Sequence, residues 1–374
     1  MQRIILCTGG TGGHIFPALA VAEHLRERFP GTEVLFVGGK SGPEREWAAR
    51  AGLPFRGLPA RGVLGRGLKS LGALWWLGRG LTLSWLLMGS FRPQVVLGLG
   101  GYAGFAPVLA ARWRRIPTAI HEQNSLPGVT NRVLGKRVDR VFLSFPDEQQ
   151  VFSPEKSVVT GNPVRREILA LRGKENRAAP GPGGRVLVLG GSQGAAAINA
   201  AVLDALPAFK AQDITLWHQT GPQDAARAQE AYAAVGMQEC RVENFIEDMA
   251  AAYAWADLVV CRAGATTVAE LTAVGMPSVL IPFPYATHNH QLLNARRLES
   301  VGAALVLVQS YLQEVSLARA VGDLLNMPGK LKDMGRAAGQ LGHPRAAEDI
   351  VAGLEELVRR KQTGNGQSQG RTEP

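Results

Sequence analysis

The residue pattern best suited to ligand chemistry lies in the second half of the chain, where residues 262–270 read RAGATTVAE after an apolar run. If a helix begins near Ala265, its first backbone N–H groups and the hydroxyls of Thr266 and Thr267 can hold phosphate oxygens. Glu270, just over one turn further on, can accept two hydrogen bonds from a ribose diol. The Thr/Glu pair can also serve only as a helix cap, and the pattern alone leaves both interpretations open.

Two glycine-rich segments extend this chemistry. Residues 9–14 read GGTGGH and residues 190–195 read GGSQGA, and each stands between a short β-branched run and a helical pattern. A glycine turn between strand and helix brings backbone N–H groups close to a bound anion. Such turns also occur for tight packing alone. Anion binding is favoured for the second segment because it opens the domain that carries RAGATTVAE.

The first glycine segment does not fit a nicotinamide site. Its GTGGHI run at residues 10–15 lacks the last glycine of G-x-G-x-x-G, and the next predicted strand ends in Gly38, Gly39 and Lys40 without an acid for the ribose. The phosphate-binding lysine of a P-loop is also missing. A dinucleotide oxidoreductase is therefore disfavoured.

Short β-branched runs alternate with Ala/Leu-rich helical stretches, which is the signature of the α/β class. The strands expected in the first half span residues 4–6, 33–37, 95–97, 118–120 and 141–143. Those expected in the second half span residues 186–189, 214–218, 241–242, 258–261, 278–281 and 304–308. A Gly- and Pro-rich linker at residues 171–184 separates two similar openings, so we predict two Rossmann-like domains.

An acid-free segment, residues 47–121, carries much of the basic excess. The net charge is +10, and this segment holds ten basic residues and five of the seven tryptophans. They are Arg50, Arg56, Arg61, Arg66, Lys69, Arg79, Arg92, Arg112, Arg114 and Arg115, with Trp47, Trp75, Trp76, Trp85 and Trp113. Cations beside interfacial tryptophans favour an anionic bilayer surface, where each Lys or Arg contributes about 1 kcal/mol.

Three other interpretations of this segment stay open. Residues 70–91 carry a single charge, Arg79, and approach the length of a membrane span, but four glycines interrupt them and a central Arg costs at least about 2.5 kcal/mol. A nucleic-acid surface fits the charge, yet no recognised binding motif accompanies it, so we expect no nucleic-acid partner. A buried helix with a solvated basic rim is the third.

The overall composition is that of a folded protein, with 46% hydrophobic and 19% charged residues. Three scattered cysteines, Cys7, Cys240 and Cys261, form neither a disulfide framework nor a CxxC pair. The start of the sequence has no signal-peptide pattern. We therefore expect a reducing, cytosolic compartment.

Six motifs occur in order over nearly the whole chain: GGTGGHIFPALAVA, HEQNSLPGVTNR, VTGNPVR, LGGSQGAAAIN, FIEDMAAAYAWADLVVCRAGATTVAE and GMPSVLIPFPYATHNHQLLNA. Together they resemble the MurG family, the UDP-N-acetylglucosamine (UDP-GlcNAc) transferases of peptidoglycan synthesis. The resemblance implies the GT-B fold, two Rossmann-like domains separated by a deep cleft. It also implies GlcNAc transfer to the C4 hydroxyl of MurNAc in lipid I, forming lipid II, by a protein bound peripherally to the cytoplasmic face of the membrane.

The resemblance also divides the chain into functional parts. Residues 1–163 correspond to the acceptor- and membrane-associating domain, and residues 164–343 to the UDP-GlcNAc-binding domain. A helix at about residues 344–362 is expected to pack back on the first domain. The polar residues 363–374 are expected to be a disordered tail.

The same resemblance implies the donor contacts. The backbone near Ile246 matches a uracil contact, Glu270 a ribose contact and Gln291 a contact to the GlcNAc hydroxyls, while Ser192 and the helix start match the diphosphate site. The positions that match donor contacts are Thr11, Gly12, Gly13, Asn124, Arg165, Ser192, Ile246, Ala265, Thr266, Thr267, Val268, Ala269, Glu270 and Gln291. A loop at residues 103–107, after Gly100, Gly101 and Tyr102, corresponds to the acceptor diphosphate contact.

His14 is the candidate general base, since an imidazole pKa of about 6.5 suits proton removal near neutrality. It can also be a helix-start residue that only orients its loop. Glu122 is the alternative base or a group that aligns His14. In-line attack on the α-linked donor inverts the anomeric centre.

No cofactor and no metal ion are expected. The sequence has no Asp-x-Asp motif and no His or Cys cluster with metal-ligand spacing. Helix N-termini and Arg165 are expected to stabilise the charge on departing UDP.

Overall fold

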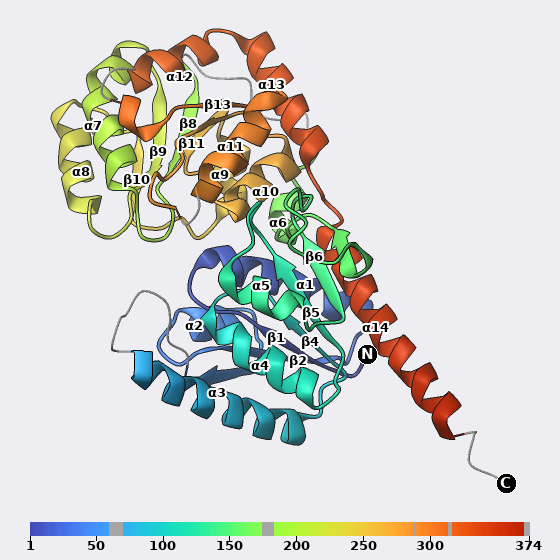
Figure 1. Ribbon diagram of the computed structural model, residues 1–374. Helices are drawn as coiled ribbons and strands as arrows, with labels where there is room; N and C mark the ends of the chain where they lie inside the picture. The colour runs from blue at the N-terminus through green and yellow to red at the C-terminus, as the bar shows by residue number, and fades with distance from the viewer. Residues whose placement is uncertain (60–69, 174–182, 287–288, 313–315, 370–374) are drawn as a thin grey trace. The chain divides into compact units, whose positions relative to one another are not determined.

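The computed structural model describes residues 1–59, 70–173, 183–286, 289–312 and 316–369. The chain forms two compact units (Figure 1). Unit 1 comprises Met1–Arg165 and Pro344–Pro374, and unit 2 comprises Arg166–His343. Arg61, Arg66 and Lys69 of the basic segment lie outside the described residues.

Unit 1 contains a parallel seven-stranded sheet in the order β3-β2-β1-β4-β5-β6-β7. The strands are β1 (Arg3–Cys7), β2 (Glu33–Gly39), β3 (Phe55–Leu58), β4 (Val95–Gly98), β5 (Thr118–Glu122), β6 (Arg140–Leu143) and β7 (Ser157–Val159). In the central strand β1, Ile5 pairs with Leu35 on one side and Val96 on the other. Ile4, Ile5 and Leu6 are fully buried. Such an unbroken apolar run is expected where helices cover both faces of a parallel sheet.

Helices cover both faces of this sheet (Figure 1). They are α1 (Gly12–Arg28), α2 (Glu44–Arg50), α3 (Ser70–Phe91), α4 (Tyr102–Trp113), α5 (Val129–Gly135) and α14 (Ala346–Gln369). Side chains of α1, α2 and α14 form one apolar core with the sheet. Side chains of α3, α4 and α5 form a second core on its opposite face. Unit 1 is therefore doubly wound, as a Rossmann-like domain is.

The helix α14 lies far from the rest of unit 1 in sequence but belongs to its core. Ile350, Val351 and Leu354 are fully buried in the cluster that includes α1. The helix extends to Gln369, so the prediction of disorder from residue 363 is wrong for residues 363–369. No proline interrupts residues 346–369, so every residue in this stretch keeps the backbone N–H that a helix needs.

Unit 2 has the same design with six parallel strands in the order β10-β9-β8-β11-β12-β13. The strands are β8 (Arg185–Leu189), β9 (Thr215–Gln219), β10 (Arg241–Glu243), β11 (Leu258–Cys261), β12 (Ser278–Leu280) and β13 (Ala304–Val306). The helices are α6 (Arg166–Leu169), α7 (Ala196–Ala211), α8 (Ala225–Ala234), α9 (Met249–Trp255), α10 (Ala265–Val274), α11 (His290–Ser300), α12 (Leu317–Leu325) and α13 (Pro328–Leu341). The predicted α/β class is confirmed.

The strands that the sequence analysis missed are β3 and β7 at the two edges of the first sheet. Their sequences, FRGL and SVV, are short and include exposed or half-buried positions. An edge strand buries less of its surface than a central one, so its sequence needs no continuous apolar run.

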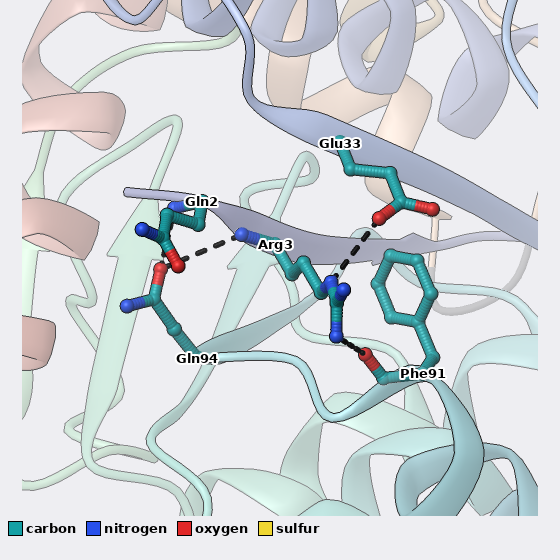
Figure 2. Close-up of polar contacts among 5 residues, drawn as sticks. All are labelled: Gln2, Arg3, Glu33, Phe91 and Gln94. Carbon is teal, nitrogen blue, oxygen red and sulfur yellow. Dashed lines mark hydrogen bonds and ion pairs between the residues drawn. The ribbon is translucent and has the colours of Figure 1, made fainter.

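Polar contacts tie the start of β1 to its neighbours (Figure 2). The side-chain oxygen of Gln94 accepts hydrogen bonds from the backbone N–H groups of Gln2 and Arg3. The Arg3 guanidinium pairs with Glu33 at 3.2 Å and donates to the backbone oxygen of Phe91 at 3.3 Å. Phe91 ends α3, so Arg3 satisfies one of the carbonyls that a helix end leaves unpaired. These contacts anchor the end of α3 to the sheet.

Among the described residues, none of the helices is long and apolar enough to cross a membrane.

Candidate functional site

Each sheet has a point where successive crossovers run to opposite sides. In unit 1 this point lies between β1 and β4, and in unit 2 between β8 and β11. Ligands of doubly wound sheets bind outside the carboxyl ends of the strands at such points. In unit 1, the loop after β1 carries the first glycine segment, and the loop after β4 carries Gly100 and Gly101. In unit 2, the loop after β8 carries the second glycine segment, and the loop after β11 leads into α10.

In unit 1, the first glycine segment leads directly into α1. Thr11 is the residue before the helix, Gly12 and Gly13 open it, and the His14 N–H donates to the Thr11 backbone oxygen at 3.0 Å. The N–H of Gly10 donates at 2.8 Å to Oε1 of Glu44, a carboxylate that is 1% exposed. The Gly10 N–H is therefore already bonded to Glu44 and is not available to a bound anion.

The His14 ring lies against the loops that follow β4 and β5. Its Nδ1 lies 3.1 Å from Oε1 of Gln123, which directly follows β5. Gly100, which has a φ of +87°, lies close to the same nitrogen. A Cβ atom on Gly100 would lie 2.9 Å from both Cε1 and Nδ1 of His14. Glycine at position 100 thus provides the space that the imidazole occupies.

The carboxylate of Glu122, the alternative base or aligning group, is bonded to its own loop. Its two carboxylate oxygens accept hydrogen bonds from the backbone and side chain of Asn124, from the Gly128 N–H and from the Asn131 side chain, over 2.8–3.3 Å. Successive side chains of an extended chain point to opposite sides, so Glu122 faces its own loop and Gln123 faces His14. Glu122 instead fixes the loop that carries Asn124.

Arg165 falls at the end of unit 1, whereas the resemblance assigned it to the second domain. Its guanidinium carbon lies 4.6 Å from the centre of the Phe16 ring in α1. A cation over an aromatic face is attracted by the ring quadrupole. This contact places Arg165 beside the helix that carries His14.

The residues expected to form the acceptor loop are helical. Helix α4 begins at Tyr102 and includes all of residues 103–107, with Pro107 inside it. Pro107 is the sixth residue of α4 and has no N–H, so the Ala103 carbonyl lacks the partner that an α-helix normally gives it. The chain turns instead at Gly100 and Gly101, both with positive φ.

In unit 2, the second glycine segment forms a tight turn. Gly191 and Gly194 have positive φ, and the Gly194 N–H donates to the Gly191 oxygen at 3.0 Å. Ser192 is exposed on this turn. A Cβ on Gly194 would lie 2.3 Å from the backbone oxygen of Thr220, just beyond β9. Glycine at position 194 allows the turn to lie directly on the end of β9.

The helix α10 begins at Ala265, as the sequence analysis predicted, and its N-cap is Gly264, which has no side chain. The Thr/Glu pair is therefore not a capping box. Thr266 and Thr267 are half-buried in the first turn, while Val268 is 2% exposed and belongs to the interior. Ala269 is half-buried beside Glu270. The first-turn N–H groups of a helix point out of its N-terminal end, where an anion can bind.

The Glu270 carboxylate is held from inside the unit. It is 6% exposed, and its Oε2 accepts a 2.9 Å hydrogen bond from the hydroxyl of Tyr253 in α9, which is 1% exposed. Tyr253 lies within one of the six motifs, but the sequence pattern alone indicates no role for it. The hydroxyl fixes the direction in which the carboxylate points.

Ile246 and Gln291 each have one polar group already engaged within unit 2. The Ile246 N–H donates to Oε1 of Gln219 at 3.0 Å, and Oε1 of Gln291 accepts from the Phe283 N–H at 2.9 Å. The Asn294 side chain donates to the Ala263 oxygen at 3.1 Å and so ties α11 to the loop before α10. The Ile246 carbonyl and the Gln291 NH₂ group take no part in these two hydrogen bonds.

Arg262 stabilises the segment that follows β12 and contacts Gln291. Its guanidinium donates to the backbone oxygens of Ile281 and Pro282 at 3.0 and 3.3 Å and lies over the Phe283 ring. Burial lowers the pKa of Arg262 to about 10. Arg262 thus holds the strand end that in turn holds Gln291.

A group of three or more His, Cys, Asp or Glu residues able to hold a metal ion does not occur among the described residues.

Replacing Glu122 by Ala is expected to loosen the loop that it organises. Each buried donor left unpaired costs about 1–3 kcal/mol, so the free energy of unfolding should fall, and the Asn124 and Gly128 amides should exchange with solvent faster. Glu122→Gln, which keeps one acceptor oxygen, should give an intermediate result. Hydrogen exchange and thermal unfolding measure both effects, and unaltered exchange at the two amides would contradict this role.

Comparisons with known proteins agree with this architecture. Residues 4–143 match the glycosyltransferase family 28 N-terminal domain, and residues 185–350 match the family 28 C-terminal domain. The UDP-N-acetylglucosamine–N-acetylmuramyl-(pentapeptide) pyrophosphoryl-undecaprenol N-acetylglucosamine transferase of Nitratidesulfovibrio vulgaris (strain DP4) is 54% identical over 96% of this chain and 98% of that protein. The Solidesulfovibrio magneticus protein of the same name is 52% identical over 95% of this chain and 97% of that protein.

A solved structure gives the same result for the fold. The crystal structure of Acinetobacter baumannii MurG superposes with a TM-score of 0.75 at 32% identity, covering 95% of this chain and all of that chain. The GT-B assignment to two Rossmann-like domains is confirmed. With 54% identity to a curated relative across 96% of its length, this chain belongs to the MurG family of N-acetylglucosamine transferases.

Proposed function

We propose that the protein transfers GlcNAc from UDP-GlcNAc to the C4 hydroxyl of MurNAc in lipid I and so forms lipid II for peptidoglycan synthesis. The observation that carries the proposal is the 54% identity, over 96% of the chain, to a transferase of that name. The geometry of each unit supports it. Unit 2 combines a helix N-terminus with a buried carboxylate, and unit 1 presents an oriented imidazole.

In this proposal unit 2 binds the donor. Ser192 on its glycine turn and the first turn of α10 hold the diphosphate, and Glu270 accepts from the ribose diol. Because the Ile246 N–H already bonds Gln219, we assign the Ile246 carbonyl to the N3–H of uracil. Because Oε1 of Gln291 is engaged, its NH₂ group donates to the GlcNAc hydroxyls.

In the same proposal unit 1 supplies the base. His14 takes the proton from the C4 hydroxyl, the oxygen attacks the anomeric carbon, and the bond from that carbon to UDP breaks with its electrons leaving on UDP. The product is β-linked. Thr11, Gly12, Gly13 and Asn124 contribute further donor contacts. Arg165 and the helix N-termini stabilise the charge on UDP, so turnover needs no divalent cation.

Release of UDP by the purified protein, supplied with UDP-GlcNAc and a lipid I analogue in the presence of EDTA, tests this activity. His14→Ala should lower kcat by about 10²–10⁴-fold, the range for general base catalysis, with little change in donor binding. Release with a diacylglycerol acceptor instead, or binding of UDP-GlcNAc without release, would contradict the proposal. Undiminished turnover by His14→Ala would remove only the base assignment.

Donor binding should depend on Glu270 and, more weakly, on Tyr253. Glu270→Ala removes a hydrogen bond to a charged group and should weaken UDP-GlcNAc binding by about 1.5–3 kcal/mol. Tyr253→Phe leaves the carboxylate but frees its orientation, and should cost about 0.5–1.5 kcal/mol. Titration calorimetry measures both values, with Tyr311→Phe at an exposed tyrosine of unit 2 as the matched control. Unchanged affinity of Glu270→Ala would exclude Glu270 from the site.

We also propose that unit 1 binds the cytoplasmic face of the cell membrane peripherally, through α3 and α4. Trp75, Leu86 and Trp113 are 60, 59 and 56% exposed on these helices. The Arg79 guanidinium lies over Trp75, and that of Arg114 lies 4.2 Å from the centre of the Trp85 ring. Exposed indoles with adjacent cations suit the interface of an anionic bilayer.

Replacing Arg79 and Arg92 by Glu should weaken binding to vesicles that contain phosphatidylglycerol. Each cation near the surface contributes about 1 kcal/mol, so each loss should reduce the affinity roughly fivefold or more. The difference should shrink as salt is raised. Lys332→Glu, at an exposed lysine of unit 2, is the control and should bind like the wild type in a co-sedimentation assay. Binding that ignores both charge and salt would favour purely apolar docking.

A further inference from the structure

We propose that Gln123 and His121 are positioning residues that hold His14 in one tautomer, with the proton on Nδ1 and the lone pair on Nε2. His121, Gln123 and His14 are linked in series by hydrogen bonds inside unit 1, and we call this series the imidazole–amide network. The use of the Nε2 lone pair as a base rests on the proposed function. The direction of each hydrogen bond in the network does not rest on that function. It follows from the Gly161 and Leu99 carbonyl oxygens, which can only accept.

The network begins at a backbone carbonyl. Nε2 of His121 lies 3.0 Å from the Gly161 oxygen, with the Ser144 hydroxyl at 3.4 Å. A carbonyl oxygen can only accept, so Nε2 of His121 carries a proton. The side chain is fully buried, and this burial, with a smaller contribution from His14, lowers the pKa of His121 to about 4. The neutral ring therefore has its lone pair on Nδ1.

A second carbonyl fixes the Gln123 amide. Nε2 of Gln123 lies 2.9 Å from the Leu99 oxygen and 3.2 Å from Nδ1 of His121. Both neighbours are acceptors, so the NH₂ group, with its two protons, must occupy this position. Rotation of the amide by 180° would place its oxygen against the Leu99 oxygen and the His121 lone pair. The orientation of Gln123, which is 2% exposed, is thus determined by its surroundings.

The direction of the last hydrogen bond follows. The Gln123 oxygen faces Nδ1 of His14 at 3.1 Å. An amide oxygen can only accept, so Nδ1 of His14 donates and carries the proton. In a neutral imidazole the other nitrogen, Nε2, then holds the lone pair. Gly100 leaves room for the ring in this position, since a Cβ atom there would lie only 2.9 Å from Cε1 and Nδ1 of His14.

The acceptor that this network gives to His14 is a neutral amide. In serine proteases a carboxylate holds the equivalent imidazole nitrogen, and it also stabilises the cation that forms. Here the acceptor is a neutral amide, which selects the tautomer but forms no ion pair. The nearby carboxylate of Glu122 is directed elsewhere by its bonds to Asn124, Gly128 and Asn131. His14 is thus prepared to accept a proton at Nε2.

The test is ¹⁵N NMR of the full-length protein with labelled histidine, at a pH at which His14 is neutral. The His14 signals are those that His14→Ala lacks. We expect Nδ1 to show the shift of a protonated ring nitrogen and Nε2 that of an unprotonated one. The reverse assignment, or averaged shifts, in the wild type would overturn the network. This measurement needs no substrate and no variant of Gln123.

Variants of Gln123 test its positioning role. Gln123→Met keeps the shape but removes the acceptor, and should average the two His14 nitrogen shifts and lower kcat at least about tenfold at unchanged donor KM. Gln123→Glu restores an acceptor for Nδ1–H but places its second oxygen against the Leu99 oxygen and the His121 lone pair, so it should restore the tautomer at a cost in stability. Gln149→Met, at an exposed glutamine of unit 1, controls for the substitution itself. Unchanged shifts in a folded Gln123→Met protein would overturn the role.

The two proposals fail in different ways. If the wild-type spectrum shows the expected tautomer but His14→Ala turns over normally, the network stands and the base assignment fails. If the spectrum shows the opposite tautomer while lipid II forms, the proposed function stands and the network is wrong.

Discussion

Direct contact between backbone segments at the carboxyl ends of the central strands is the constraint on which both candidate sites depend. In unit 1 a Cβ on Gly101 would lie 2.1 Å from the Gly9 oxygen, and in unit 2 one on Gly194 would lie 2.3 Å from the Thr220 oxygen. Only glycine permits such approaches. Because the loops touch through their main chains, their polar groups are fixed by the sheets. The side chains of the two candidate sites are therefore held in fixed positions as well.

The carboxylates near these loops divide into two kinds. Glu44 and Glu122 are almost fully buried and accept from backbone N–H groups of their own unit, so they stabilise loops. Glu270 is also buried, and the Tyr253 hydroxyl donates to one of its oxygens. A buried carboxylate is costly unless its oxygens find donors. The Tyr253 hydroxyl therefore offsets part of the cost of burying the Glu270 carboxylate.

The sequence predicted the central elements well and the side-chain directions poorly. Continuous apolar runs at residues 4–6 and 258–260 identified β1 and β11, because buried parallel strands need them. The start of α10 followed from the Gly264–Ala265 step. In contrast, nothing in the order Glu122, Gln123 tells which of the two faces His14. That depends on where β5 ends, and the structure places Gln123 against His14.

Tertiary contacts also explain why residues 103–107 are helical. Residues 103–107 lack a strong helix pattern, yet they form α4 because α3 and the sheet pack against them. Tyr102, 53% exposed, starts this helix directly after the glycine turn that borders His14. Tyr102 therefore stands at the end of the sheet where the imidazole lies, whereas the exposed indole of Trp113 stands at the opposite end of α4.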